Sequence, residues 1–194
     1  MVRASVVWLN YNSMKFMDIA IKSLESFLSL DFDGYELIIV DNASNDGSFE
    51  VIKKFIEEHK PSNVKVKLIH NDKNLGYAGG MNVGWDARDP DSRYVAFVNN
   101  DLIATPESLA KLVEYMEGSE KMATISGLIY LRDKNIIFSA GWTVDDILTA
   151  IGICGKVNPN DCATINKPHY VTNADGAYCV VNADIIKRFG FDGK

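Results

Sequence analysis

Hydrophobic and polar positions along the first half of the chain follow two alternating periods. Short runs rich in β-branched and aromatic residues have the composition of buried strands, and they cover residues 3–11, 35–42, 64–71 and 93–101. The segments between these runs place apolar side chains at helical spacing, and they cover residues 13–30, 49–59 and 74–88. This alternation predicts an α/β fold with a mostly parallel central sheet and helices on both faces.

Two more regular elements are expected directly after residue 101. Residues 105–118 predict a helix, with Thr105 as its N-cap in the way that Ser13 is the expected N-cap of the first helix. Residues 122–131 are apolar and β-branched, which predicts a further strand.

The rest of the chain is less regular. Residues 132–169 break into turn-rich pieces, which we interpret as an irregular excursion over the active face. A final strand and a short helix are expected after this excursion, and Asn182 or Asp184 has the side chain to cap that helix.

Polar side chains follow each of the four predicted parallel strands at the point where the strand ends. They are Asn10 and Asn12, Asp41 and Asn42, residues 71–80, and residues 99–101. Parallel sheets bind their ligands beyond the carboxyl ends of the strands, so these four groups are expected to line one crevice.

Composition narrows the class of protein. A chain of 194 residues, 47% hydrophobic and 24% charged, suits one globular domain. The formal net charge of -6 argues against a nucleic-acid partner. No stretch has the length of a membrane span or the apolar core of a signal peptide, which predicts a soluble cytoplasmic protein.

The three cysteines, Cys154, Cys162 and Cys179, are odd in number and have no CxxC spacing. The sequence therefore indicates neither a disulfide framework nor a zinc site, and we expect reduced thiols.

Glycine motifs limit the kind of ligand. The segment after the first strand lacks the GxGxxG of dinucleotide-binding folds, and the chain has no GxxxxGK[ST] phosphate loop. Gly76, Gly79 and Gly80 lie instead after the third strand. There they permit either close approach of the backbone to a ligand or close packing of a helix on the sheet.

Five motifs carry a resemblance to a known family, and they are SVVWLNYN, VDNASNDGS, NLGYAGGMNVG, FVNND and DGAYCVVNADIIKRFGFD. In this order and spacing the chain resembles the family 2 glycosyltransferases with the GT-A fold, particularly the rhamnosyltransferase-like branch of polysaccharide enzymes. The resemblance covers nearly the whole chain. It implies a single GT-A catalytic domain over residues 1–194 and a metal-dependent transferase that uses a UDP- or dTDP-sugar.

The resemblance implies roles for the first three strand ends. It places the pyrimidine base among Asn10, Tyr11, Asn12 and Asp41, and it places the base and ribose along Asn74, Gly76 and Gly80. A buried carboxylate is a good acceptor for the N3–H of uracil or thymine. Aspartate is also common in turns, so capping of the 42–48 turn is the alternative interpretation for Asp41.

The segment Asn99, Asn100 and Asp101 occupies the place of the family's DXD motif. The resemblance implies that Asp101 binds Mg²⁺ or Mn²⁺ and that Asn99 and Asn100 contact the donor. Asn99 departs from the motif because it replaces the first acidic residue. The alternative is that Asp101 merely caps the following turn.

The resemblance further implies that the sugar is transferred with inversion to a hydroxyl group of a glycan or of a lipid-linked acceptor. The expected cytoplasmic location includes the cytoplasmic face of the membrane. Asp175 and Gly176 would contact the donor sugar, although Asp175 also suits a turn. In the family, the general base lies in an acidic motif that follows the last helix expected in this chain. We therefore expect a domain truncated before its base. The alternative is that Asp175 or Asp184 is the base.

Two rival classes remain open. A nucleotidyltransferase shares the layered sheet, but it would favour a basic, glycine-rich loop after the first strand, which is missing. A catalytically silent domain that only binds nucleotide sugars would differ from the enzyme in activity and not in binding.

Overall fold

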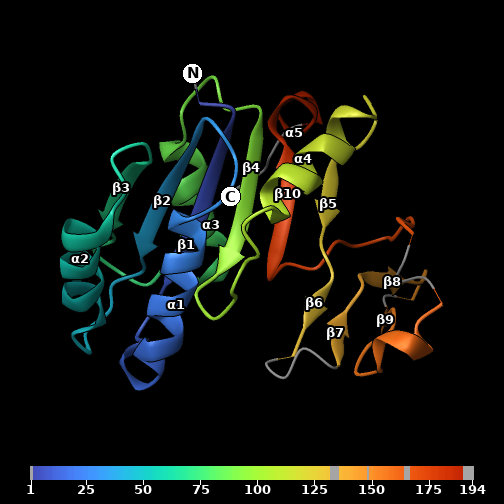
Figure 1. Ribbon diagram of the computed structural model, residues 1–194, viewed down its shortest axis with the longest axis horizontal. Coiled ribbons are helices and arrows are strands. Elements are labelled where there is room, and N and C mark those ends of the chain that lie inside the picture. The colour runs from blue at the N-terminus through green and yellow to red at the C-terminus, as the bar shows by residue number, and fades with distance from the viewer. Residues whose placement is uncertain (1, 132–135, 148, 164–166, 190–194) are drawn as a thin grey trace.

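The computed structural model describes residues 2–131, 136–147, 149–163 and 167–189. Its centre is a six-stranded sheet (Figure 1) in the order β3, β2, β1, β4, β10, β5. Strands β1 to β4 are parallel, whereas β10 runs antiparallel to both of its neighbours. The strands are β1 (Ala4–Asn10), β2 (Tyr35–Asp41), β3 (Lys65–His70), β4 (Tyr94–Asn99), β5 (Thr124–Ser126) and β10 (Tyr178–Asn182).

Helices cover both faces of this sheet, as predicted. They are α1 (Met17–Leu28), α2 (Ser48–His59), α3 (Gly76–Ala87), α4 (Ser108–Glu117) and α5 (Ala183–Phe189). Residues of α1, α2 and α4 share one apolar cluster with Val6 and Trp8 of β1, whereas residues of α3 and α5 share a second cluster with Val7. Successive side chains of a strand point to opposite faces, so β1 supplies both cores.

Helix α3 packs unusually close to the sheet, because it carries glycine where it crosses β1. A Cβ added at Gly84 would lie 2.2 Å from Cγ1 of Val7, and one added at Gly80 would lie 2.5 Å from Cδ1 of Leu9. Both distances are shorter than carbon atoms tolerate. Of the two interpretations of the glycine-rich segment, helix-to-sheet packing therefore applies to Gly80.

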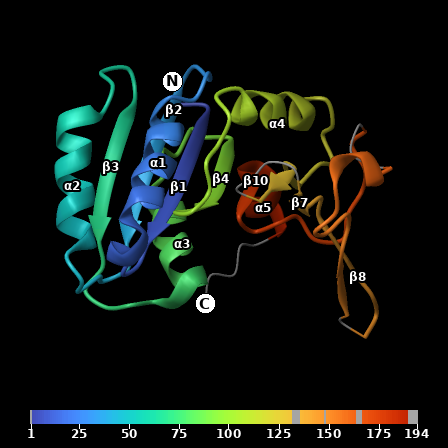
Figure 2. The same cartoon turned by 60° about the horizontal axis from the view of Figure 1, so that its bottom comes forward.

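In the described part of the second half of the chain, four short strands lie outside the central sheet. They form two antiparallel pairs, β6 (Ile129–Tyr130) with β7 (Ile137–Ser139) and β8 (Trp142–Val144) with β9 (Ala150–Gly152). Figure 2 shows β7 and β8 beyond β10, on the side of the sheet away from β3. The predicted strand at 122–131 is therefore two strands, and the predicted irregular excursion has regular structure.

The expectation of reduced thiols is wrong for two of the three cysteines. Cys154 and Cys162 form a disulfide, with their Cα atoms 5.6 Å apart. A short 3-10 helix, η2 (Pro159–Asp161), precedes Cys162, and this compact turn brings the two residues together. Cys spacing alone does not reveal such a turn. Cys179 in β10 is free, and burial raises the pKa of its thiol to about 11, so it is protonated at neutral pH.

Two of the predicted helix caps are displaced. Ser13 precedes a 3-10 turn, η1 (Met14–Phe16), and its hydroxyl donates to Oδ1 of Asn10 instead of capping α1. Thr105 lies in the turn before α4, which begins three residues later. Asn182 does cap α5, because its Oδ1 accepts the backbone N–H of Asp184 at 3.0 Å. Within the described ranges, no helix has the length and apolarity that crossing a membrane requires.

Candidate active site at the carboxyl ends of the sheet

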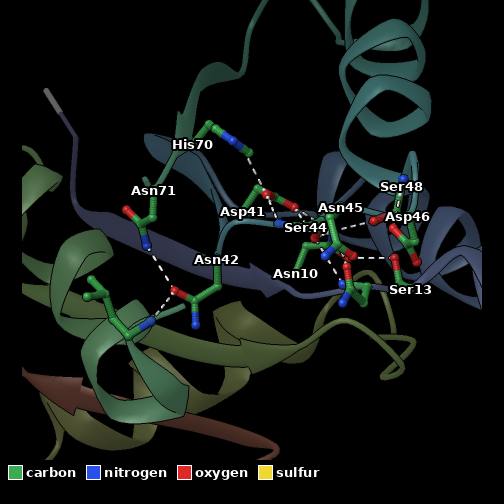
Figure 3. Close-up of polar contacts among 12 residues, drawn as sticks. Asn10, Ser13, Asp41, Asn42, Ser44, Asn45, Asp46, Ser48, His70 and Asn71 are labelled. Carbon is green, nitrogen blue, oxygen red and sulfur yellow. Dashed lines mark hydrogen bonds and ion pairs between the residues drawn. The ribbon is translucent and has the colours of Figure 1, made fainter. Parts of the chain in front are cut away.

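The polar groups after β1, β2 and β3 meet at one end of the sheet (Figure 3). The group after β4 lies at the same end, where it shares a cavity with them. The buried Asn10 joins two of them, because its Nδ2 donates to Oδ2 of Asp41 at 2.7 Å. Its Oδ1 accepts from Nδ2 of Asn100 at 3.2 Å. Asn10 thus links the end of β2 to the segment that resembles the DXD motif.

Asp41 is fully buried, and four internal donors surround its carboxylate. Asn10 and the Ser44 hydroxyl donate to Oδ2, both at 2.7 Å. The Ser44 N–H donates to Oδ1 at 2.9 Å, and Nδ1 of His70 lies 2.9 Å from the same atom. A carboxylate has about four lone-pair sites. The protein therefore fills the hydrogen-bonding capacity of Asp41, which fixes the 41–48 turn against β1 and β3.

Asn42, the next residue, performs a similar task on the other side of the strand end. Its Nδ2 donates to Oδ1 of Asn74 at 2.8 Å and to the Gly76 carbonyl at 3.0 Å. Its Oδ1 accepts from Nδ2 of Asn71 at 3.1 Å. One buried amide thus sets the path of the chain from β3 into α3.

A cavity of about 340 Å³ opens beside these amides. Its lining comes from all four strand ends and from the start of α3, and it consists of Leu9, Tyr11, Asn42, Asn74, Gly76, Tyr77, Asn99, Asn100 and Asp101. Six of these residues are predicted site residues. The sequence analysis did not select Leu9, Asn42 and Tyr77, although Asn42 lies among the polar residues at the strand ends.

Six predicted residues lie outside this lining, and four of them belong to the strand ends and α3. Asn10 and Asp41 are buried behind it, and Gly80 packs on Leu9. Asn12 has a φ of 47°, and its Oδ1 accepts the N–H of Asn45 at 2.9 Å. Asparagine tolerates this left-handed backbone better than most residues do, so Asn12 shapes the turn after β1.

Asp101 is the one acidic residue in the lining. It is exposed, and within the described part of the chain no hydrogen bond or ion pair engages its carboxylate. No cluster of three or more metal-ligating side chains exists among the described residues. Mg²⁺ is commonly held by one or two carboxylates together with substrate phosphates, so a single carboxylate fits a metal ion that binds together with a diphosphate.

Asp175 and Gly176 form a turn that faces α3. The Asp175 carboxylate accepts from Nε1 of Trp142 and from the N–H of Ala177, both at 2.9 Å. The Tyr77 hydroxyl donates to the Gly176 carbonyl at 2.9 Å. Burial raises the pKa of Tyr77 to about 12, with smaller contributions from Cys179 and Asp175, so this donor keeps its proton at neutral pH. Asp175 is buried and holds this turn in place.

Asp184 lies at the opposite end of the sheet. Its carboxylate is 3.5 Å from Nε of Arg93, and the neighbouring Asn182 pairs with Tyr94 at the start of β4. Five residue steps of a strand separate Tyr94 from Asn99, which is about 16 Å at about 3.3 Å per step. Asp184 is therefore too far from the cavity to serve as a base there.

Comparisons with known proteins agree with this architecture. A processive diacylglycerol beta-glycosyltransferase of Mycoplasma pneumoniae is 27% identical over 172 residues, which are 85% of this chain and 46% of that protein. The chain spans less than half the length of the first three curated relatives that it matches.

Two solved structures share the fold over 97% of this chain. One is the mannosyltransferase PcManGT from Pyrobaculum calidifontis in complex with GDP-Man and Mn²⁺, with a TM-score of 0.68, 16% identity and 46% of that chain covered. The other is TarS from S. aureus in complex with UDP, with a TM-score of 0.60, 15% identity and 49% covered. At these identities the likeness establishes the GT-A fold alone.

The family model of glycosyl transferase family 2 matches residues 5–150. That span contains all of β1 except Ala4, all of β2 to β4, and every residue of the cavity lining. It is also about three quarters of the chain, and the chain therefore belongs to glycosyl transferase family 2.

Proposed function

We propose that this domain is a glycosyltransferase that binds a UDP- or dTDP-sugar in the cavity at the carboxyl ends of β1 to β4. The observation that carries the proposal is Asp101, an exposed carboxylate without a described partner on the rim of a cavity otherwise lined by amides, tyrosines and apolar groups. Such a cavity offers flat surfaces and amide hydrogen bonds to a nucleoside and one charged ligand for a metal ion.

In this proposal the pyrimidine lies near Tyr11 and Asn74, and the amide of Asn74 offers hydrogen bonds to the edge of a uracil or thymine ring. Asn42 shapes this wall from behind, because its own amide already bonds to Asn71, Asn74, Leu75 and Gly76. Asp41 orders the turn behind the base instead of touching it, because its carboxylate already accepts four internal hydrogen bonds. The two similar structures hold GDP-Man and UDP, so the fold does not select the nucleotide and the choice of pyrimidine needs a direct test.

Asp101 would hold Mg²⁺ or Mn²⁺ in this proposal, with Asn99 and Asn100 beside it. The bound metal ion would neutralise the diphosphate and make it a better leaving group. Asn10 keeps this segment in place, since its Oδ1 accepts from the Asn100 amide. The protein's own part is to position the donor and to shield it from water.

Transfer with inversion is a single displacement. The oxygen of an acceptor hydroxyl bonds to the anomeric carbon while the bond from that carbon to the diphosphate breaks, and the hydroxyl proton passes to a general base. Asp175 is not positioned for that task, because its carboxylate accepts from Trp142 and Ala177. We therefore assign Asp175 to holding the loop next to the donor sugar.

The acceptor in this proposal is a hydroxyl group of a glycan or of a lipid-linked acceptor, and the relative from Mycoplasma pneumoniae, named for its action on diacylglycerol, supports an acceptor that contains a lipid. The rhamnosyltransferase-like branch stays a prediction. So does a cytoplasmic location, including the cytoplasmic face of the membrane. The Cys154–Cys162 disulfide argues against a cytoplasmic location, because stable disulfides are rare in the cytosol of most organisms.

Thermal unfolding in the presence of nucleotides tests the proposal. With Mn²⁺ and a ligand at about 100 times its dissociation constant, UDP- or dTDP-sugars should stabilise the domain by about 2.7 kcal/mol, which is a rise in Tm of about 5–10 °C. We expect Asp101→Ala or EDTA to remove most of this rise. Asp184→Ala is the matched control, since it removes an exposed carboxylate at the other end of the sheet and should leave the rise unchanged.

Three results would contradict this proposal in different ways. Tighter binding of GDP-mannose than of any pyrimidine counterpart would overturn the choice of base. An equal rise in EDTA and in Mn²⁺ would overturn the role of Asp101. A donor that binds, but whose sugar is not transferred to any of a panel of saccharide and lipid-linked acceptors and whose nucleoside diphosphate is not released, would favour the silent binding domain over the enzyme.

A further inference from the structure

The Tyr77 hydroxyl connects two parts of the molecule that are 99 residues apart in sequence. Tyr77 stands in the first turn of α3, and its side chain lines the cavity. The hydroxyl donates to the carbonyl of Gly176 in the loop that leads into β10. The ring is half exposed, so burial of the ring alone does not account for its position.

The same loop is anchored from the opposite side by Trp142 of β8. The backbone of Trp142 exchanges hydrogen bonds with Asn173, and its indole N–H donates to the Asp175 carboxylate. The loop is also bonded to the central sheet, because the Asn99 N–H donates to the Ala177 carbonyl at 3.0 Å and the Asp175 N–H donates to the Ser126 hydroxyl at 3.2 Å. Among these attachments, Tyr77 contributes a side chain that also lines the cavity.

We propose that Tyr77 is a positioning residue that holds the 174–177 loop over the donor cavity and thereby sets how firmly the sugar half of a nucleotide sugar is bound. The inference rests on the proposed function. The Tyr77 ring forms part of the wall for the nucleoside half, whereas its hydroxyl acts on the sugar half through Gly176. The two halves of the donor should therefore respond differently to loss of the hydroxyl.

The variant Tyr77→Phe separates these contributions, because it keeps the ring and removes only the hydroxyl. Binding is measured by calorimetry for UDP, dTDP, UDP-glucose, UDP-N-acetylglucosamine and dTDP-glucose, each with Mn²⁺. We expect the variant to bind the preferred nucleotide sugar about three- to tenfold more weakly, the effect of one hydrogen bond. Binding of the matching nucleoside diphosphate should stay within about twofold.

Tyr115→Phe is the matched control. Tyr115 lies on α4, outside the cavity lining, and it has the same exposed fraction of 51% as Tyr77. This variant should bind every probe as the wild type does. Hydrogen exchange provides a second readout, in which the amides of residues 174–178 should exchange faster in Tyr77→Phe while those of β1 and β2 stay unchanged.

Each outcome decides the question. Equal weakening of nucleoside diphosphate and nucleotide sugar, or no weakening of either, overturns the role of the hydroxyl. Unchanged exchange at residues 174–178 does the same, because the loop would then not depend on Tyr77. If the wild type binds UDP or dTDP but gains nothing from the sugar, the inference fails and the nucleotide site stands. If the wild type binds none of the probes, the proposed function fails as well.

Discussion

The two halves of this domain position the residues of the cavity in different ways. In the first half, short parallel strands end in polar side chains that bond to one another, as Asn10, Asp41 and His70 do. In the second half, β6 to β9 are short and pair only two at a time, and a disulfide and the Trp142 side chain hold their connections. The first half therefore carries a preformed floor, and the second adds a wall by contacts between distant segments.

The difference shows which part of the site depends on the core. The floor stands mainly at the ends of β1, β2 and β4, whose side chains are mostly buried, whereas the edge strand β3 is partly exposed. The packing of the sheet therefore fixes most of the geometry of the floor. On the cavity side, the 174–177 loop is held by the Tyr77 side chain and by a backbone hydrogen bond from the Asn99 N–H to the Ala177 carbonyl. Variants that break one half should therefore affect the other half little.

The largest effect is expected from Asp41→Ala. The change removes a buried acceptor and leaves the donors of Asn10, Ser44 and His70 without it, which should lower the free energy of unfolding by about 3–5 kcal/mol. Urea denaturation measures this loss. Asp101→Ala, at the end of another parallel strand, should change the same quantity by less than about 0.5 kcal/mol because Asp101 is exposed. Similar losses in the two variants would show that the network around Asp41 is not what stabilises the floor.

Cys154→Ser tests the second half. A crosslink between residues eight apart should be worth about 2.5 kcal/mol through the entropy of the unfolded chain. The variant should unfold at a correspondingly lower urea concentration and still bind nucleotide as the wild type does. Reductant is the control: it should destabilise the wild type to the same extent and leave the variant unchanged. A wild type that is indifferent to reductant would argue that the crosslink does not support this half.

Gly84→Ala is expected to cost about 2 kcal/mol. The added methyl group would overlap Val7 in the central strand, and this overpacking outweighs the better helix propensity of alanine. Gly127→Ala is the control, because a Cβ there would meet no atom within 4 Å, and its cost should be below about 0.5 kcal/mol. The double variant Val7→Ala/Gly84→Ala should lose less free energy of unfolding than the sum of the losses in the two single variants, because Val7→Ala removes the atoms that the new methyl group would overlap. Strictly additive losses would contradict the close contact.

The sequence was sufficient for the first half because strand, helix and strand-end polarity repeat there in register. The convergence of the four strand ends and the two-sided helical cover were predictable from that pattern, and the structure confirms both. The directions in which single side chains point were not predictable from the sequence. Asp41 and Asn42 are neighbours on one strand, and the fact that Asn42 and not Asp41 lines the cavity depends on partners in β1, β3 and α3.

The second half could not be predicted because its elements depend on distant partners. Nothing local to Trp142 indicates that its indole bonds to Asp175, 33 residues later. A final strand was expected where β10 lies. Its place between β4 and β5, however, is decided by pairing with strands that precede the whole 132–169 segment in the sequence. The disulfide likewise follows from a turn that the spacing of two cysteines does not reveal.

The antiparallel placement of β10 also determines when the site is completed as the chain is made. Tyr77 and Gly176 are 99 residues apart, and at 5–20 residues per second a ribosome needs about 5–20 s to add that length. Until β10 emerges, β4 is the outer strand of the growing sheet, and its free backbone groups can pair with another chain. A nascent chain therefore passes through an interval of several seconds in which the floor of the cavity can form while its last wall does not yet exist.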